Sequence, residues 1–207
     1  LTDLTELNLR YYESTDLSAI TTLSKLITLD ITGSSFEENL SFLTCMTNLQ
    51  SLDLTNYEIL NSTSVGSIAK LTQLTRLIVG MDDENFKSDV KGLSVLTNLR
   101  ELSTPAFIDY SRFKYLQRAT FQYDPKLLDY VAWMPNLKDL SLIDVQFNKK
   151  RNFIQYWVHL TRLQIDQFQP RQVIPQLSYL QNLNELSLDS FYDDCRKFEL
   201  FEPHPPN

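Results

Sequence analysis

The residue types that most often carry out nucleophilic or metal chemistry are few and scattered in this sequence. Its 207 residues include two cysteines, two histidines and four glycines. Cys45 and Cys195 lie far apart, and we expect two independent thiols. His159 and His204 have no Cys, Ser or acidic residue at a recognisable catalytic spacing. Zinc-ligand spacings and a glycine-rich phosphate loop are also missing, so we expect no enzymatic activity, no metal site and no cofactor.

Two short runs of like charge are candidates for binding rather than catalysis. Asp82-Asp83-Glu84 has the composition of an acidic contact or a cation site, and Lys149-Lys150-Arg151 that of a docking patch. Each run also fits a solvated loop, because charged side chains favour water over a protein interior. We favour the solvated loop for both.

A more ordered set of charges recurs along the second half of the chain. The sign alternates from one member to the next through Arg76, Glu101, Arg118, Asp139, Arg162 and Glu185. If each residue occupies the same position on successive parallel strands, neighbouring side chains are close enough to pair. The column is then either an ion-pair ladder or a patterned recognition strip. We favour the ladder, because charges that pair with one another are less available to a ligand.

The elements that would position this column are nine copies of the signature L-x-x-L-x-L, whose first residues recur at steps of 17 to 25 residues. The first residues of the copies are Leu4, Leu26, Leu49, Leu74, Leu99, Leu116, Leu137, Leu160 and Leu183. The L-x-L end of each copy alternates as a β-strand does. The copy that begins at Leu116 has Ala119 where a leucine is expected. The short step before it spans Pro105-Ala106-Phe107, and it indicates either a drifted repeat or a kink that shapes a binding site.

Upstream of each strand, apolar residues fall at every third position, as in Leu17, Ile20, Leu23 and Leu26. An α-helix advances about 100° per residue, so a three-residue stripe drifts off one face. Short 3₁₀ or turn-like segments fit this spacing better. The two longest steps predict added loops at residues 56–64 and 81–89.

These motifs resemble the leucine-rich-repeat family, and the short repeat with its every-third-residue tail is similar to the internalin-like, bacterial-style subclass. The resemblance covers about Leu4 to Leu188. It implies an α/β fold: a right-handed solenoid with a curved parallel sheet on the concave face and 3₁₀ or turn segments on the convex face.

The sequence departs from that family in the turn after each strand. The family usually places Asn or Cys three positions after the last strand leucine, where its side chain bonds to backbone groups. Aromatic residues predominate here, which predicts an aromatic plug in most turns. The nine residues are Tyr12, Ser34, Tyr57, Asp82, Phe107, Asp124, Val145, Phe168 and Phe191.

Composition and chain ends limit the partners that we expect. The formal net charge of −7 argues against nucleic-acid binding, and no apolar run has the length of a membrane span. We assign residues 1–190 to the solenoid and residues 191–207 to a C-terminal cap and tail. Since the pattern is already under way at the first residues, we expect this chain to be part of a longer one. The sequence leaves the cellular compartment open.

The family resemblance implies a protein–protein interaction module that binds a protein partner through the concave face and neighbouring loops. The alternative is a passive scaffold or spacer segment of a larger surface or effector protein. Outward-facing strand residues in the irregular middle of the repeat array are the candidate contacts. They are Arg76, Ile78, Glu101, Arg118, Asp139, Ile143 and Arg162.

Overall fold

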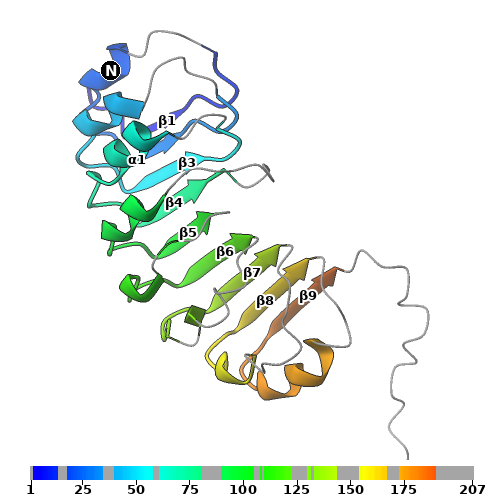
Figure 1. Cartoon of the computed structure of the whole chain (residues 1–207). Coiled ribbons are helices and arrows are strands. Elements are labelled where there is room, and N and C mark those ends of the chain that lie inside the picture. The colour runs from blue at the N-terminus through cyan, green and yellow to red at the C-terminus, as the bar shows by residue number, and fades with distance from the viewer. Residues whose placement is uncertain are drawn as a thin grey trace, which may run out of the picture.

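The nine predicted strands form one parallel sheet, in which every strand pairs with its sequence neighbours. The computed structural model describes residues 2–13, 18–34, 40–57, 61–80, 90–104, 108, 110–122, 130–131, 133–143, 154–166 and 173–189. The strands are β1 (Glu6–Asn8), β2 (Thr28–Asp30), β3 (Ser51–Leu54), β4 (Arg76–Val79), β5 (Glu101–Thr104), β6 (Arg118–Gln122), β7 (Asp139–Ile143), β8 (Arg162–Asp166) and β9 (Glu185–Asp189). Their order along the sheet follows the chain from end to end (Figure 1).

The repeats stack in register because the same leucine of each signature faces the same core. Leu29 pairs with Leu52 and Leu52 with Leu77, and all three side chains are fully buried. The outward positions between them are more exposed, which gives the alternating burial expected of a sheet with one covered face. No repeat can bury its apolar edge alone, so the stack folds around one shared core.

The irregular sixth repeat keeps this register. Ala119 of β6 pairs with Leu102 of β5, and it is buried like the leucines on either side. Beneath it, Tyr110 packs edge to face against Phe121 with ring centroids 4.7 Å apart, and both rings are buried. The core of this repeat thus contains large aromatic side chains beside a strand in which one leucine is replaced by alanine. Strand pairing passes through the repeat without interruption, while residues 105–107 lie outside the described residues.

Between the strands, the chain returns through short 3₁₀ helices, as the three-residue apolar spacing predicts. These are η1 (Ser18–Thr22), η2 (Leu40–Cys45), η3 (Lys91–Val95), η4 (Tyr110–Arg112), η5 (Ile154–Tyr156) and η6 (Ile174–Tyr179). The turns that follow keep the same period, since Leu23 N–H donates to Ile20 and Leu26 N–H donates to Leu23, at 3.0 and 3.1 Å. Each three-residue step therefore returns an apolar side chain to the core side.

One return segment departs from this prediction and forms an α-helix, α1 (Ser62–Ile68). Its N-cap is Asn61, whose Oδ1 accepts a hydrogen bond from Ser64 N at 2.8 Å. Val65 and Ile68 lie about one turn apart and are both buried. The longer step into this repeat supplies the extra residues that an α-helical turn needs. The predicted loop at residues 56–64 is therefore wrong for Ser62–Ser64, which are helical.

The return turns are joined across repeats by asparagine side chains just before the first leucine. The Asn Nδ2 atoms donate to carbonyl oxygens of the preceding repeat at 2.7–2.9 Å. The pairs are Asn48 with Ser24, Asn98 with Thr72, Asn136 with Lys114, and Asn182 with Val158. A backbone carbonyl that a short turn leaves unpaired is satisfied in each case. This chain thus has bridging asparagines at the opposite end of the strand from the usual family position.

The turns after the strands are filled in two different ways. Ser34 is buried, donates from Oγ to the Leu9 carbonyl at 2.6 Å and accepts from Tyr12 N at 3.1 Å, so it performs the backbone-bonding role of the family asparagine. Tyr57 is buried and acts as the predicted plug, and its burial raises its pKa to about 12. Tyr12 is exposed, so the plug prediction is wrong there. The six later positions of this set lie outside the described residues.

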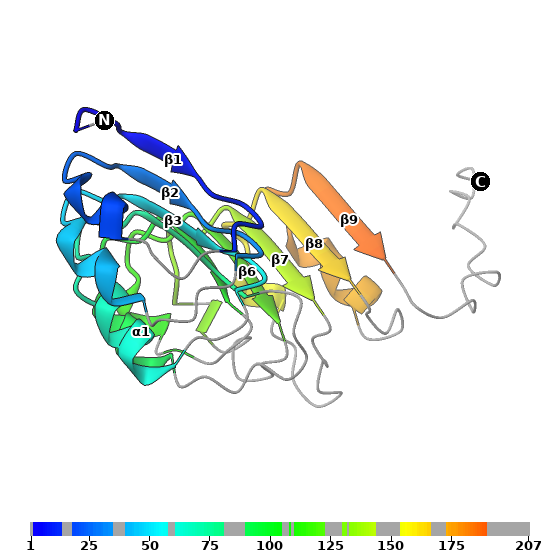
Figure 2. The same ribbon diagram turned by 90° about the horizontal axis from the view of Figure 1, so that it is seen from above.

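Seen from above, the strands form one layer and the return helices another, and the sheet curves along its length (Figure 2). The core lies between the two layers and includes fully buried Trp157. None of the helices in the described part of the chain has the length and apolar character needed to cross a membrane.

Candidate binding surface

The alternating charges form an ion-pair ladder across six strands. Strand register places Glu101 beside Arg118, Arg118 beside Asp139, and Asp139 beside Arg162. Nitrogen–oxygen distances along the ladder run from 3.0 to 3.8 Å. The successive pairs are Arg76–Glu101, Glu101–Arg118, Arg118–Asp139, Asp139–Arg162 and Arg162–Glu185. The predicted ladder is confirmed, and each of its arginines is held between two carboxylates.

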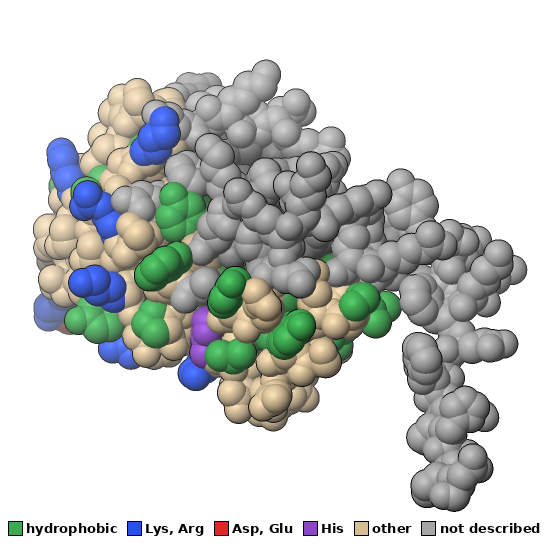
Figure 3. Space-filling view, turned by 60° about the horizontal axis from the view of Figure 1, so that its bottom comes forward, with side chains coloured by type: hydrophobic (Ala, Val, Ile, Leu, Met, Phe, Trp, Pro, Cys, Tyr) green, Lys and Arg blue, Asp and Glu red, His purple; other side chains and the backbone are tan. Residues whose placement is uncertain are grey.

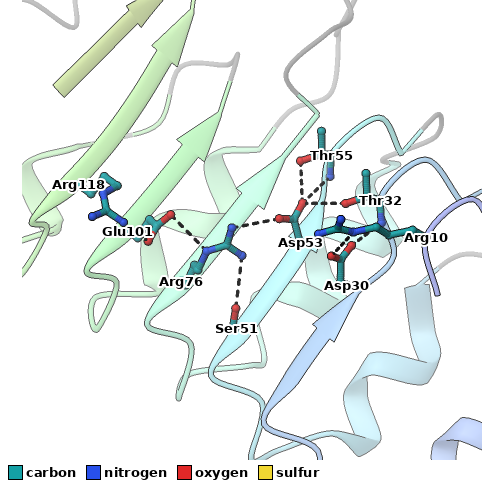
Figure 4. Close-up of polar contacts among 9 residues, drawn as sticks. All are labelled: Arg10, Asp30, Thr32, Ser51, Asp53, Thr55, Arg76, Glu101 and Arg118. Carbon is teal, nitrogen blue, oxygen red and sulfur yellow. Dashed lines mark hydrogen bonds and ion pairs between the residues drawn. The ribbon is translucent and has the colours of Figure 1, made fainter. Parts of the chain in front are cut away.

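The ladder begins one repeat earlier than the sequence predicted, at Asp53 of β3. Register places Asp53 opposite Ile78, but Arg76 reaches it diagonally, with Nη2 3.1 Å from Asp53 Oδ2 (Figure 4). The same guanidinium donates to Ser51 Oγ at 3.4 Å. Asp53 lies two residues after Ser51 on β3, outside the column of alternating charges, so the alternation in sequence does not reveal it. Long side chains bridge such diagonal neighbours readily.

Asp53 is also a structural anchor, because its side chain caps the end of its own strand. Its Oδ1 accepts hydrogen bonds from Thr55 N at 3.1 Å and from Thr55 Oγ1 at 2.7 Å, and Thr32 Oγ1 of the preceding repeat donates to it at 3.2 Å. Figure 4 shows the carboxylate between the two threonines and Arg76. These bonds form an Asx turn, in which a side-chain oxygen holds the backbone two residues on. The carboxylate is therefore largely occupied within the chain.

The first two repeats use the same device. Asp30 Oδ1 accepts from Thr32 N at 3.0 Å, and Asn8 Oδ1 accepts from Arg10 N at 3.1 Å. Asp30 also pairs with Arg10, whose Nε lies 2.6 Å from its Oδ2. Burial raises the pKa of Asp30, but the bonds from Thr32 and Arg10 outweigh it and hold that pKa below its usual value. Asn8, Asp30 and Asp53 thus bond to the backbone at the ends of their strands, and their side-chain oxygens are less available to a ligand.

The later part of the ladder is much more open to solvent. The side chains of Arg118 and Arg162 are 58% and 47% exposed, whereas that of Asp53 is 13% exposed. Ile78 and Ile143, predicted to be exposed, are half-buried instead. Both lie in central strands, which have a paired strand on each side.

A shallow, open depression of about 500 Å³ runs over β5 to β9 beside the ladder. Its lining residues are Arg100, Glu101, Gln117, Arg118, Lys138, Asp139, Thr161, Arg162, Asn184 and Glu185. Four of these side chains are cationic and three are anionic, so the depression carries a small positive excess in a chain of net charge −7. Such a surface favours an acidic contact.

Two of the cations in this depression were missed by the sequence analysis. Arg100 and Lys138 each occupy the position just before a strand, one residue ahead of the ladder column. Lys138 Nζ donates to the His159 carbonyl at 3.2 Å, whereas the exposed guanidinium of Arg100 has no bonding partner among the described residues. The signal that could have found them is the outward-facing column next to the one examined.

The described residues contain no cluster of three or more potential metal-ligating side chains. Cys45 is a free, exposed thiol, while Cys195 lies outside the described residues. His159 lies at a return turn, where burial and then the charge of Lys138 lower its pKa, which favours the neutral ring. His204, the acidic run at residues 82–84 and the basic run at residues 149–151 also lie outside the described residues. Nothing in the described part assembles a nucleophile, a base and an oxyanion site.

Stacked parallel strands, three-residue return segments and bridging asparagines together define a leucine-rich-repeat solenoid. Solved internalin structures show the same architecture. An internalin from Listeria monocytogenes, InlF, superposes with a TM-score of 0.64 at 15% identity, over 90% of this chain and 61% of its own. Internalin C2 from the same organism gives a TM-score of 0.53 at 20% identity, over 90% and 82% of the two chains. The internalin-like prediction of the fold is confirmed.

A leucine-rich-repeat protein from Leptospira interrogans shares the fold as well, with a TM-score of 0.53 at 22% identity, over 89% of this chain and 54% of its own. The chain thus spans about three fifths of InlF and about half of the Leptospira protein. The sequence matches no protein-family model and no curated protein.

Proposed function

We propose that this solenoid is a protein-binding module whose partner lies along the depression over β5 to β9. The observation that carries this proposal is the open, mixed-charge surface there, with Arg100 lacking a partner among the described residues and Arg118 largely exposed. Arginine is enriched among the residues that dominate binding energy in protein interfaces. The leucine-rich-repeat fold, which presents one long surface to a partner, is consistent with this role.

In this proposal the ladder provides the alternating charges that a partner recognises, and Arg100 provides a cation that attracts an acidic group on the partner. Each ladder arginine holds two carboxylates, so the column presents alternating charge at fixed strand spacing. A partner with the opposite alternation gains specificity, because a shifted register brings like charges together. An acidic group on the partner pairs with Arg100 without disrupting a pair within this chain.

A spacer function is the second candidate, and the ladder itself favours it. Each ladder arginine already pairs with two carboxylates of this chain, so none needs a partner protein to satisfy its charge. The arginines are Arg76, Arg118 and Arg162. A surface built only to relieve repulsion within the sheet would have these same contacts. A spacer, however, gives no reason for the unpartnered guanidinium of Arg100 beside the ladder.

The test is the affinity of an identified partner for a variant that loses the pattern but not the fold. A partner is captured from extract, purified and titrated against the chain in a calorimeter. In the variant Glu101→Gln/Arg118→Gln/Asp139→Gln, Arg76 keeps Asp53 and Arg162 keeps Glu185, so no charge is left facing a like charge. We expect at least a tenfold loss of affinity, with an unfolding midpoint close to that of the parent chain.

Arg100→Gln is the second variant, and we expect it to weaken binding by itself without changing stability. Its control is Lys25→Gln, which removes an exposed cation paired only with Asp3 in the first two repeats. Full affinity of the purified partner for both the ladder variant and Arg100→Gln contradicts binding at this surface. If the affinity is unchanged in both variants, the ladder has only a structural role.

A further inference from the structure

A second surface lies on the return side, at a position that ends the 3₁₀ helices η3, η4, η5 and η6 and lies in a turn in two other repeats. In the fourth to ninth repeats this position forms a column four residues before the first leucine, here named the return strip. Its members are Lys70, Val95, Arg112, Trp133, Tyr156 and Tyr179. The strip therefore passes from mainly cationic residues to three consecutive aromatic residues.

The aromatic members of the strip are exposed to a degree that packing does not explain. Trp133, Tyr156 and Tyr179 are 78%, 58% and 45% exposed, although core positions lie one or two residues away. Trp157, next to Tyr156, is fully buried, so the repeat has a place for an aromatic ring in its core and still presents another outside. Exposed tryptophan and tyrosine at one position of three successive repeats are typical of an interaction surface.

Backbone hydrogen bonds order the turns that carry several of these side chains. Trp133 N–H donates to the Tyr130 carbonyl at 2.8 Å, and the Tyr179 carbonyl accepts from Gln181 N–H at 3.1 Å. The equivalent bond at Arg112 comes from Lys114 N–H, at 3.1 Å. Lys70 and Val95 accept the same bond, from Thr72 N–H at 3.0 Å and Thr97 N–H at 2.9 Å, so this turn recurs at four of the six strip positions. Little backbone entropy is lost when such a surface binds.

Charge on the return side differs sharply from that of the whole chain. The described residues between one strand and the next, from residue 18 to residue 184, include no Asp or Glu in the return helices or the turns that follow them. Exposed lysines are present there, among them Lys70 and Lys114. Among the described residues that Figure 3 colours on this face, several hydrophobic side chains and Lys or Arg side chains are exposed, with almost no acidic ones. The described part of this face is apolar and basic in a chain of net charge −7.

We propose that the return strip binds an acidic segment of a partner protein, whose apolar side chains contact Trp133, Tyr156 and Tyr179. Acidic residues of that segment face the cationic end of the strip, around Lys70 and Lys114. Charge complementarity selects this occupant, since the described return side repels no anion. A flat anionic membrane fits less well, because the strip follows the outer side of a curved stack and its residues turn away from any one plane (Figure 1). The proposal is independent of the concave-face proposal.

The experiment selects binders from a displayed library of random peptides on the full chain. An enriched peptide is synthesised, and its affinity is measured by fluorescence anisotropy against variants of the chain. We expect enriched peptides to combine Asp or Glu with Phe, Leu or Trp. Trp133→Ser/Tyr156→Ser is expected to lower the affinity for the synthetic peptide at least tenfold. Lys70→Ser/Lys114→Ser is expected to lower the same affinity several-fold at low salt.

Three controls make the result decisive. Ile27→Ser removes an exposed apolar side chain in the second repeat. This variant and the triple variant Glu101→Gln/Arg118→Gln/Asp139→Gln are both expected to leave peptide affinity unchanged. Thermal unfolding is measured for every variant, and Tyr179→Ser alone serves as a second strip variant should the double variant unfold. Phosphatidylserine vesicles are tested in parallel. Three results would each overturn the proposal. The enriched peptides bind the strip variants with unchanged affinity, or the selection does not enrich acidic and apolar peptides, or vesicles alone bind in a strip-dependent way.

Discussion

The concave ladder and the return strip solve opposite problems with the same device, a single position repeated through the stack. In the ladder, every arginine lies between two carboxylates at distances of 3.0–3.8 Å, so the groups largely satisfy one another. In the strip, three aromatic side chains recur at one position of successive repeats and remain 45–78% exposed. Regularity alone therefore does not show what a repeated position does. Whether the side chains pair with their neighbours or stand free distinguishes stabilising columns from binding ones.

The two surfaces share one core, and truncating a core side chain should lower the free energy of unfolding more than any surface substitution does. Leu140→Ala removes a fully buried side chain directly beside Ala119, where a leucine is already missing. We expect a loss of about 2–5 kcal/mol in the free energy of unfolding, measured with urea. Leu186→Ala is the matched control: it occupies the same column in β9 but is 42% exposed, and it should cost less than half as much. Equal costs for the two would mean that the last repeat is packed as fully as the middle.

A smaller effect is expected where the ladder meets a strand end. Asp53→Ala leaves Thr55 N–H without its acceptor and leaves Arg76 with Glu101 as its remaining carboxylate, and we expect a loss of about 1–3 kcal/mol. Asp53→Asn keeps an oxygen for the Thr55 amide, just as Asn8 serves the amide of Arg10, so it should recover most of that loss. Denaturant unfolding of both variants separates the Asx turn from the ion pair. If Asn is as costly as Ala, the charge and not the turn stabilises this end.

The exposed part of the ladder should contribute little to stability. Arg118→Gln removes two ion pairs whose arginine is 58% exposed, and we expect a loss below about 1 kcal/mol, because solvent screens such pairs. Raising the salt to about 0.5 M should shrink the difference between variant and parent. Arg76→Gln, whose side chain is less exposed at 36%, is the comparison and should cost more. A large, salt-independent loss at Arg118 would contradict the view that this region is solvent-screened.

The smallest effect concerns pH and the turn at His159. Burial and the charge of Lys138 lower the pKa of His159 below its ordinary value of 6.5, so the unfolded chain binds a proton more readily than the folded chain. The contribution of this residue is present above pH 6.5 and is lost as the pH falls below it. In His159→Asn this dependence should disappear with stability unchanged at neutral pH, since Asn136 and Asn182 occupy the equivalent position. Unfolding curves collected between about pH 5 and 8 measure it; an unaltered slope contradicts the assignment.

The strands, their order and the ladder could be predicted because each rests on a short local period that the core enforces. Residues such as Leu29, Leu52 and Leu77 recur with the spacing that places them side by side in the sheet. The role of Asp53 could not be read in this way, because the diagonal contact from Arg76 depends on side-chain reach rather than on register. The α-helix at Ser62–Ile68 was missed for a similar reason: the three-residue pattern of Val65 and Ile68 also fits one helical turn.

Two signals in the sequence were available but unused. The asparagine before the first leucine recurs in alternate repeats, at Asn98, Asn136 and Asn182, and the acidic ladder residue follows three positions later each time. A period of two repeats therefore underlies both the turn bridges and the charge alternation. The aromatic column at Trp133, Tyr156 and Tyr179 has constant steps of one repeat, and it lies outside the strands that supply the candidate binding residues.

Photo-cross-linking tests most directly the central claim that this solenoid binds a protein along β5 to β9. A photoreactive phenylalanine analogue replaces Ser141, which lies between Thr120 and Gln164 in the middle of the sheet surface. The same analogue at Thr72, an exposed turn residue of the return side, serves as the control. The account predicts that the purified concave-face partner is cross-linked from position 141 and not from position 72. Cross-linking from position 72 alone, or from neither position while the partner still binds, would contradict it.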